Sequence, residues 1–117
     1  MHKILPKYYY FIDRFHKEHI KNLDKNIAII FRKYNKKLNI IEIYKIKKFC
    51  KLTGRKFLIS NNIKLALKLD LDGVYLPSFN KSLKINIYSK KTKFLVLGSA
   101  HNIKEIRIKE KQNVNAI

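Results

Sequence analysis

The sequence contains only one cysteine, Cys50, among its 117 residues. A single thiol can form neither a disulfide within the chain nor a metal site built from several cysteines. The neighbouring residues Ile46, Phe49 and Leu52 are apolar, which indicates a thiol packed in the protein core. The cysteine content therefore excludes both a disulfide-stapled fold and a cysteine-rich zinc module.

Long apolar runs, glycines and prolines are also scarce. No apolar run approaches the roughly eighteen residues that a membrane span requires, and no signal-peptide core follows Met1. Only three glycines and two prolines are present, and no linker or low-complexity tract interrupts the chain. Hydrophobic residues make up 46% of the sequence, which is enough for a core. We expect one domain over residues 1–117, in the cytoplasm and without a membrane partner.

Acidic residues and arginines are few, whereas lysine is abundant. The formal net charge is +19, from 23 lysines and 4 arginines against 8 acidic residues. Such a charge can bind nucleic acid through counterion release. The lysines are spread over every segment, however, and arginine supplies the bidentate recognition of phosphates and bases. A basic nucleic-acid-binding protein is therefore an alternative that rests on charge alone, and we favour a buried strand over a base-stacking platform for Tyr8 to Phe11.

The sequence alternates apolar runs with amphipathic segments. Its best-marked helix begins at Asn39, has Glu42 in the capping-box position, and ends at Gly54. The pattern predicts strands at 8–12, 27–31, 57–59, 74–76 and 94–97, with helical segments between them, and a sixth strand from about Val114. The segment 83–88 is a weaker helix, and Asn102 with Glu105 repeats the capping pattern for a helix to about Gln112.

The segment from Phe57 to Pro77 is the most informative part of the chain. It reads FLISNNIKLALKLDLDGVYLP, which predicts a strand, a short helix and a second strand within about twenty residues. Strands joined by such a helix are normally parallel and buried. Ligands of parallel sheets bind beyond the carboxyl ends of the strands. We therefore expect the functional site to include the polar residues 60–62 and 78–80.

Five strand–helix units followed by the start of a sixth predict an α/β fold of the (βα)8 TIM-barrel type, with a parallel sheet of about five to six strands. The chain stops inside an apparent strand, so we expect an incomplete barrel. Unclosed strand edges would promote self-association.

Two segments resemble the thiamine-phosphate synthase and TenI-like family of (βα)8 barrels. The first, from Ser60 to Leu76, is similar to the family's strand ending in Asn-Asp, its Val-Asp-Leu-Ala-Leu helix and its Ala-Asp-Gly-Val-His-Leu strand. The second, from Leu97 to His101, is similar to the family's Gly-Val-Ser-Thr-His turn. The two segments occur in the family's order.

The resemblance implies a transferase of thiamine biosynthesis, which joins a hydroxymethylpyrimidine diphosphate to a thiazole phosphate with the help of Mg²⁺. It places Arg32 on the family's arginine, which would contact the diphosphate, and Ser99 on a phosphate-binding turn. The phosphorylated substrate would also meet Ser60, Asn61 and Tyr75.

The matched positions also differ from the family pattern. Asn61 and Asn80 stand at the family's metal positions, where neutral amides replace carboxylates and are weaker Mg²⁺ ligands. Tyr75 replaces the family's histidine. His101, at a strand's carboxyl end, could act as a general acid or base, or it could only shape its turn.

Three functional classes follow. The first is a TenI-like transferase whose isolated chain we expect to be inactive. The second is a non-catalytic module that binds a phosphorylated ligand, distinguished by binding that does not need magnesium. The third is the basic nucleic-acid-binding protein, which would lose affinity steeply as salt rises and would not depend on Arg32.

Overall fold

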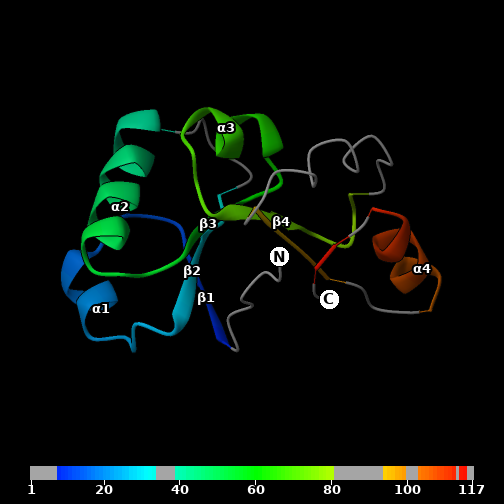
Figure 1. The fold of residues 1–117 in the computed structure, drawn as a ribbon, viewed down its shortest axis with the longest axis horizontal. Coiled ribbons are helices and arrows are strands. Elements are labelled where there is room, and N and C mark those ends of the chain that lie inside the picture. Colours follow the sequence, from blue (N-terminus) through cyan, green and yellow to red (C-terminus); the bar gives the residue numbers. More distant parts are fainter. Residues whose placement is uncertain (1–7, 34–38, 81–93, 100–102, 113, 116–117) are drawn as a thin grey trace.

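A computed structural model describes residues 8–33, 39–80, 94–99, 103–112 and 114–115. These residues form an α/β fold in which one helix follows each of the first three strands and a fourth helix follows β5 (Figure 1). The elements are β1 (Tyr8–Ile12), α1 (Lys17–Lys21), β2 (Ile27–Phe31), α2 (Ile40–Leu52), β3 (Phe57–Ser60), α3 (Ile63–Lys68), β4 (Gly73–Leu76), β5 (Leu95–Gly98) and α4 (Ile103–Lys111).

The five strands form one parallel sheet in the order β1-β2-β3-β4-β5. The strand order follows the chain order without a reversal. Because all five strands are parallel, their carboxyl ends lie on one side of the sheet, here called the carboxyl edge. The opposite edge, where the strands begin, is called the amino edge. The predictions of an α/β fold and of a parallel sheet are confirmed.

Local sequence explains where α2 begins and ends and where α3 begins. The Asn39 side chain accepts a hydrogen bond from the Glu42 amide at the start of α2, and Gly54 adopts a positive φ of 72° just after it. Asn62 caps α3 by accepting from the Leu65 amide. The capping pattern at Asn39 is confirmed, although Glu42 does not complete the reciprocal box. Its carboxylate instead accepts from the amide of Phe15, which joins α2 to the end of β1.

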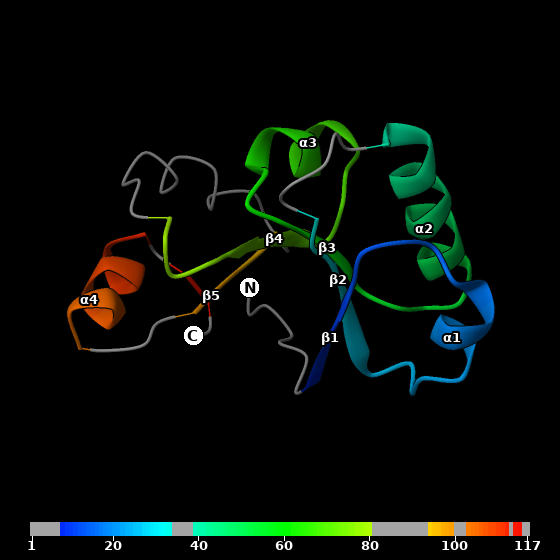
Figure 2. The same ribbon diagram turned by 180° about the vertical axis from the view of Figure 1, so that it is seen from behind.

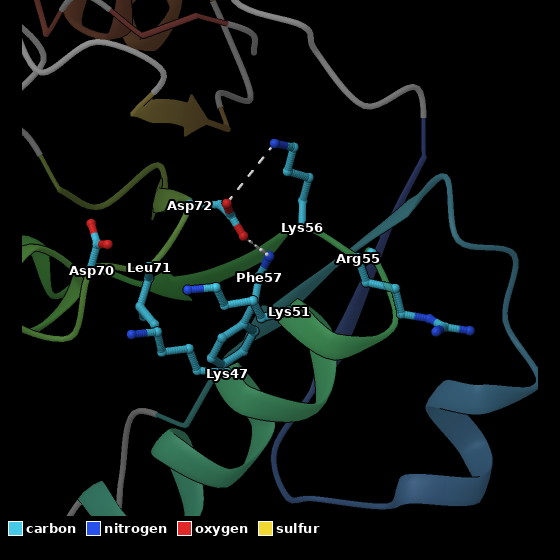
Figure 3. Close-up of a pocket in the computed structure, with 9 residues that line it drawn as sticks. Lys47, Lys51, Arg55, Lys56, Phe57, Asp70, Leu71 and Asp72 are labelled. Carbon is cyan, nitrogen blue, oxygen red and sulfur yellow. Dashed lines mark hydrogen bonds and ion pairs between the residues drawn. The ribbon is translucent and has the colours of Figure 1, made fainter.

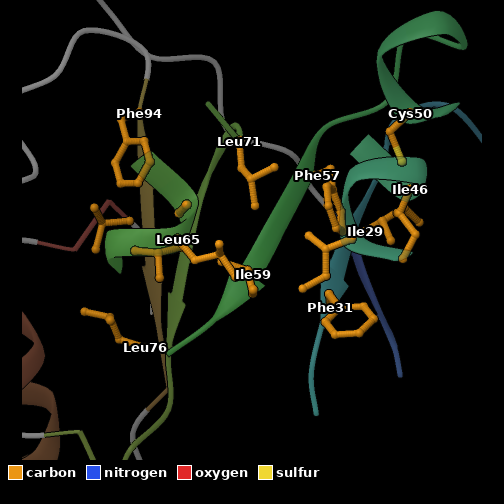
Figure 4. Close-up of a cluster of buried hydrophobic side chains, with 14 of the residues drawn as sticks. Ile29, Phe31, Ile46, Cys50, Phe57, Ile59, Leu65, Leu71, Leu76 and Phe94 are labelled. Atoms are coloured by element: carbon orange, nitrogen blue, oxygen red, sulfur yellow. The ribbon is translucent and has the colours of Figure 1, made fainter. Parts of the chain in front are cut away.

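The core lies mainly on the sheet face that carries the helices (Figure 4). Apolar side chains from α1, α2 and α3 pack there against alternate strand residues. In Figures 1 and 2, α2 and α3 lie on the same side of the sheet. The buried members of this cluster are Ile20, Ile29, Phe31, Ile43, Ile46, Cys50, Phe57, Ile59, Leu65, Ala66, Leu71, Val74, Leu76, Phe94 and Val96.

The other face of the sheet, here called the inner face, carries a second apolar cluster. Its buried members are Ala28, Ile30, Leu58, Leu95 and Leu97, and the partly buried rings of Tyr9, Phe11 and Tyr75 pack against them. Successive strand residues point to opposite faces, so both faces being apolar explains the continuous hydrophobic runs of β2 and β3.

The sequence also predicted a sixth strand, a helical segment at 83–88 and a helix cap at Asn102. The described residues form no sixth strand, but the Asn115 amide donates to Val96 O, and Asn115 Oδ1 accepts from the Val96 amide. Asn115 therefore occupies the position beside β5 that a sixth strand would take. The helical segment expected at 83–88 and the cap expected at Asn102 lie outside the described residues.

None of the described helices combines the length and the apolar content needed to traverse a bilayer. The longest of them, α2, has 13 residues.

Candidate functional site

Polar and aromatic side chains from four strands meet at the carboxyl edge. Ser60 is the register partner of Tyr75, and Tyr75 is the partner of Leu97. Arg32 and Ser60 follow the paired residues Phe31 and Ile59, so they continue the same row. Strand alternation places this row on the inner face. The structure thus brings together three of the residues that the sequence predicted for substrate binding.

An aromatic stack joins two members of this row. The Arg32 guanidinium lies over the Phe11 ring, with 4.0 Å between its carbon and the ring centroid. The Phe11 and Tyr75 rings meet edge to face at 5.2 Å. An exposed cation–π contact of this kind is worth about 0.5–1 kcal/mol and orients the guanidinium plane. The site therefore has a positioned cation beside two rings.

The donors of Arg32 remain available to a ligand. Arg32 is exposed, and no hydrogen bond or ion pair joins its guanidinium to another residue in the part of the chain that the structure describes. Its backbone amide donates to Ile12 O, which fixes the end of β2 against β1. A planar guanidinium with open N–H groups can bind a phosphate in bidentate fashion.

Asn61 and Asn80 close the site on the side of β3 and β4. Asn61 adopts a positive φ of 57°, and its amide donates to Tyr75 O over 2.7 Å. The Asn80 amide nitrogen Nδ2 donates to Asn61 Oδ1 over 2.6 Å. Asparagine tolerates the left-handed region better than most residues, so this turn suits it. The two predicted metal positions are therefore adjacent, but they bind each other.

This donor set does not fit a resident magnesium ion. Asn61 Oδ1 accepts from Asn80, and Asn80 Oδ1 accepts from Gln112 Nε2 at 3.3 Å. Mg²⁺ prefers carboxylate oxygens and octahedral geometry. Among the described residues, no group of three or more histidine, cysteine or acidic side chains could hold a metal ion.

The remaining predicted residues are Ser99 and His101. Ser99 follows β5 directly, and its amide donates to Leu76 O over 3.1 Å. That amide continues the ladder between β4 and β5, so only the Ser99 hydroxyl is left to meet a ligand. His101 lies outside the described residues.

Sequence reasoning missed Phe11, Lys109 and Gln112. Lys109 is fully buried, and its ammonium Nζ donates to Asn80 O at 2.6 Å and to Gln112 Oε1 at 2.7 Å. Burial lowers the pKa of Lys109, an effect that nearby Glu105 opposes. In a chain with 23 lysines, nothing in the sequence distinguishes Lys109 as a buried one.

The amino edge contains a basic cavity of about 320 Å³. Figure 3 shows the Lys47 and Lys51 side chains extending from α2 on the same side, whereas Arg55 points away from them. Lys56 faces Asp72 at 4.0 Å, and Asp72 also accepts from the Phe57 amide at 2.8 Å.

Electrostatics disfavour this cavity as an anion site. The carboxyl ends of α2 and α3 reach the same edge, and a helix carboxyl end carries partial negative charge. Asp70 and Asp72 add two carboxylates to the cavity wall. Arg55 is committed elsewhere, because its Nη2 donates to Lys21 O and Leu23 O. The lysines here therefore balance local negative charge.

No family model matches the chain, and a search of curated proteins also finds no match. The assignment of the carboxyl edge therefore rests on geometry and on the chemistry of the residues gathered there.

Proposed function

We propose that the protein is a TenI-like member of the thiamine-phosphate synthase type and that it binds a phosphorylated, ring-containing small molecule at the carboxyl edge. Five parallel strands in chain order, with helices between the first four of them, are the arrangement found in part of a (βα)8 barrel. This order supports the barrel assignment, because open doubly wound sheets reverse their strand order at the ligand site.

The observation that carries the proposal is the stacked Arg32 beside Tyr75. A phosphate oxygen approaching Arg32 would meet N–H donors that Phe11 holds in a fixed plane. A ligand ring attached to that phosphate would lie near Tyr75, whose own ring is oriented by Phe11. Rings that pack edge to face or offset add about 0.5–1.5 kcal/mol beyond area burial.

The residues favour binding over group transfer. Departure of a diphosphate needs strong charge stabilisation, which metal ions and several cations normally supply. Among the described residues of this row, Arg32 is the one cation, and amides stand where metal carboxylates would be. We therefore propose a non-catalytic phosphate-ligand module that works without magnesium, and we expect the transferase reaction of the family to be absent from this chain.

Calorimetric titration with inorganic diphosphate and with thiamine phosphate tests this proposal. Replacing Arg32→Gln removes charge-assisted hydrogen bonds worth about 1.5–3 kcal/mol, so we expect a loss of affinity of about 10- to 100-fold. Arg107→Gln on exposed α4 is the matched control, because it removes the same charge elsewhere. Removal of magnesium with a chelator should leave the affinity of the wild-type protein unchanged.

Two results would overturn the proposal. Equal losses of affinity in both arginine variants, with binding that collapses as salt rises from about 50 to 200 mM, would indicate a general polyanion binder such as a nucleic-acid-binding protein. Binding that requires magnesium would instead favour the metal-dependent chemistry that the family resemblance implies.

A further inference from the structure

Lys109 is a fully buried charge, which needs a structural reason. Transferring an ammonium group from water into a protein interior costs several kcal/mol unless good hydrogen bonds compensate. Here the compensation comes from Asn80 O at 2.6 Å and Gln112 Oε1 at 2.7 Å. Both distances are short, as expected when the donor is charged.

Gln112 also binds Asn80. It is also fully buried, and its Nε2 donates to Asn80 O at 2.9 Å and to Asn80 Oδ1 at 3.3 Å. The Asn80 carbonyl therefore accepts hydrogen bonds from two side chains at the carboxyl end of α4. Asn80 is thus held both by its backbone and by its side chain.

The contacts continue from Asn80 into the candidate site. With Asn80 Oδ1 accepting from Gln112, its Nδ2 is oriented to donate to Asn61 Oδ1. Asn61 in turn donates its backbone amide to Tyr75 O. A continuous chain of hydrogen bonds therefore runs from α4 to the turn that separates Ser60 from α3.

The neighbouring strand leaves room for the lysine stem. A Cβ atom added to Gly98 would lie 2.7 Å from Lys109 Cδ and 3.4 Å from its Cε. Because Gly98 has no side chain, the apolar stem of Lys109 packs directly against β5 at this position, and its Nζ reaches Asn80 O.

We propose that Lys109 is a positioning residue: acting with Gln112 through Asn80, it fixes the Asn61 turn and thereby the arrangement of Ser60 and Tyr75. Its effect on ligand affinity rests on the proposed function, whereas its effect on the turn does not. Lys109 touches no ligand in this account.

Amide hydrogen exchange followed by NMR, combined with diphosphate titration, tests the inference. Lys109→Met keeps most of the apolar stem and removes the donors. We expect the Asn61 amide to exchange at least about tenfold faster in this variant, relative to the Asp72 amide, which donates to Phe57 O at the amino edge. Diphosphate affinity should fall about 3- to 10-fold in the same variant.

Two controls separate positioning from general destabilisation. Ile46→Val removes one methylene group from the core under α2, so it should accelerate Asn61 and Asp72 to the same degree. Lys111→Met, on the exposed side of α4, should change neither amide. If Lys109→Met does not fold, Gln112→Leu removes part of the contact set and should shift Asn61 in the same direction by a smaller factor.

Selective acceleration of Asn61 would support the inference even if the wild-type protein binds no diphosphate, and that second result would overturn only the proposed function. An Asn61 amide whose exchange is accelerated no more than that of Asp72 in the Lys109→Met and Gln112→Leu variants would overturn the inference.

Discussion

The two edges of the sheet both carry basic side chains, but they use them differently. At the amino edge, Lys47, Lys51 and Lys56 surround a cavity whose wall also contains two carboxylates. At the carboxyl edge, Arg32 is the single cation among the described residues of its row, and the Phe11 ring orients it. The number of positive charges therefore does not identify an anion site. The decisive features are an oriented donor and the absence of a competing partner.

The two edges also differ in the contacts that hold them together. At the amino edge, Gly73 lies so close to the Leu95 backbone that a side chain would not fit, and the Asp72 carboxylate accepts a hydrogen bond from the Phe57 amide. At the carboxyl edge, long polar side chains bridge separate loops. Substitutions at the amino edge should therefore cost more folding free energy than those at the carboxyl edge, whereas only carboxyl-edge substitutions should also change ligand affinity. Four predictions test this division, beginning with the largest effect.

Gly73→Ala should be the most destabilising substitution. A Cβ at this position would lie 2.1 Å from Leu95 O, a backbone atom that cannot move without disturbing the pairing of β4 and β5. Overpacking typically costs about 1–3 kcal/mol, and a backbone clash belongs at or above the upper end of that range. Gly98→Ala, whose Cβ would meet the flexible Lys109 stem, should cost about 1 kcal/mol. Urea denaturation measures both, and equal losses of stability would contradict the account.

Asp72→Ala should destabilise the protein by about 1–3 kcal/mol, because it leaves the Phe57 amide without its side-chain acceptor. The ion pair with Lys56 is exposed and long, so it should contribute little. Lys56→Ala is therefore the control and should change the free energy of unfolding by less than about 0.5 kcal/mol. Neither variant should alter diphosphate affinity. A large effect of Lys56→Ala would show that the ion pair, rather than the amide contact, matters.

The stability of the wild-type protein should rise with pH relative to that of Lys109→Met. Burial lowers the pKa of Lys109 below its ordinary value of 10.5. Between the lowered pKa and 10.5, the unfolded chain holds a proton that the folded chain has released, so the free energy of unfolding increases as pH rises through this window. Denaturation of both proteins at a series of alkaline pH values isolates this contribution. A difference that stays constant with pH would contradict a lowered pKa.

Self-association through strand edges should be the weakest effect. Among the described residues, β1 pairs on one side only, and Tyr8 on this strand is 66% exposed. The net charge of +19 opposes contact between two copies, so association should increase when salt screens the charge. Sedimentation velocity at about 0.1 and 1 M salt measures this. Tyr8→Lys should suppress the association, and a protein that is monomeric at both salt concentrations would remove the proposal.

Local sequence predicted much of the fold. The apolar runs at 27–31 and 57–59 predicted buried strands, which β2 and β3 confirm, and the caps at Asn39 and Gly54 predicted the ends of α2. The location of Ser60 and Asn61 at the carboxyl edge followed from the direction of a parallel strand. These features depend on residues close together in the chain, which is why pattern and capping chemistry were sufficient.

The tertiary relationships in the site could not be predicted in the same way. Phe11 belongs to an aromatic run in which each ring could face either side of the sheet, and only the register with β2 places it under Arg32. Lys109 contacts Asn80, a residue 29 positions earlier in the chain. A surface lysine and a buried one look alike in sequence. The burial of Lys109 depends on Gly98 and on Asn80, which are distant from it in the chain.

Mapping of amide chemical shifts during a thiamine phosphate titration tests the central claim most directly, because it shows which edge receives the ligand. We expect the largest shifts at Arg32, Ser60, Asn61 and Tyr75, with the amino edge unchanged. Shifts centred on Lys47, Lys51 and Lys56 would contradict it and would assign anion binding to the basic cavity instead.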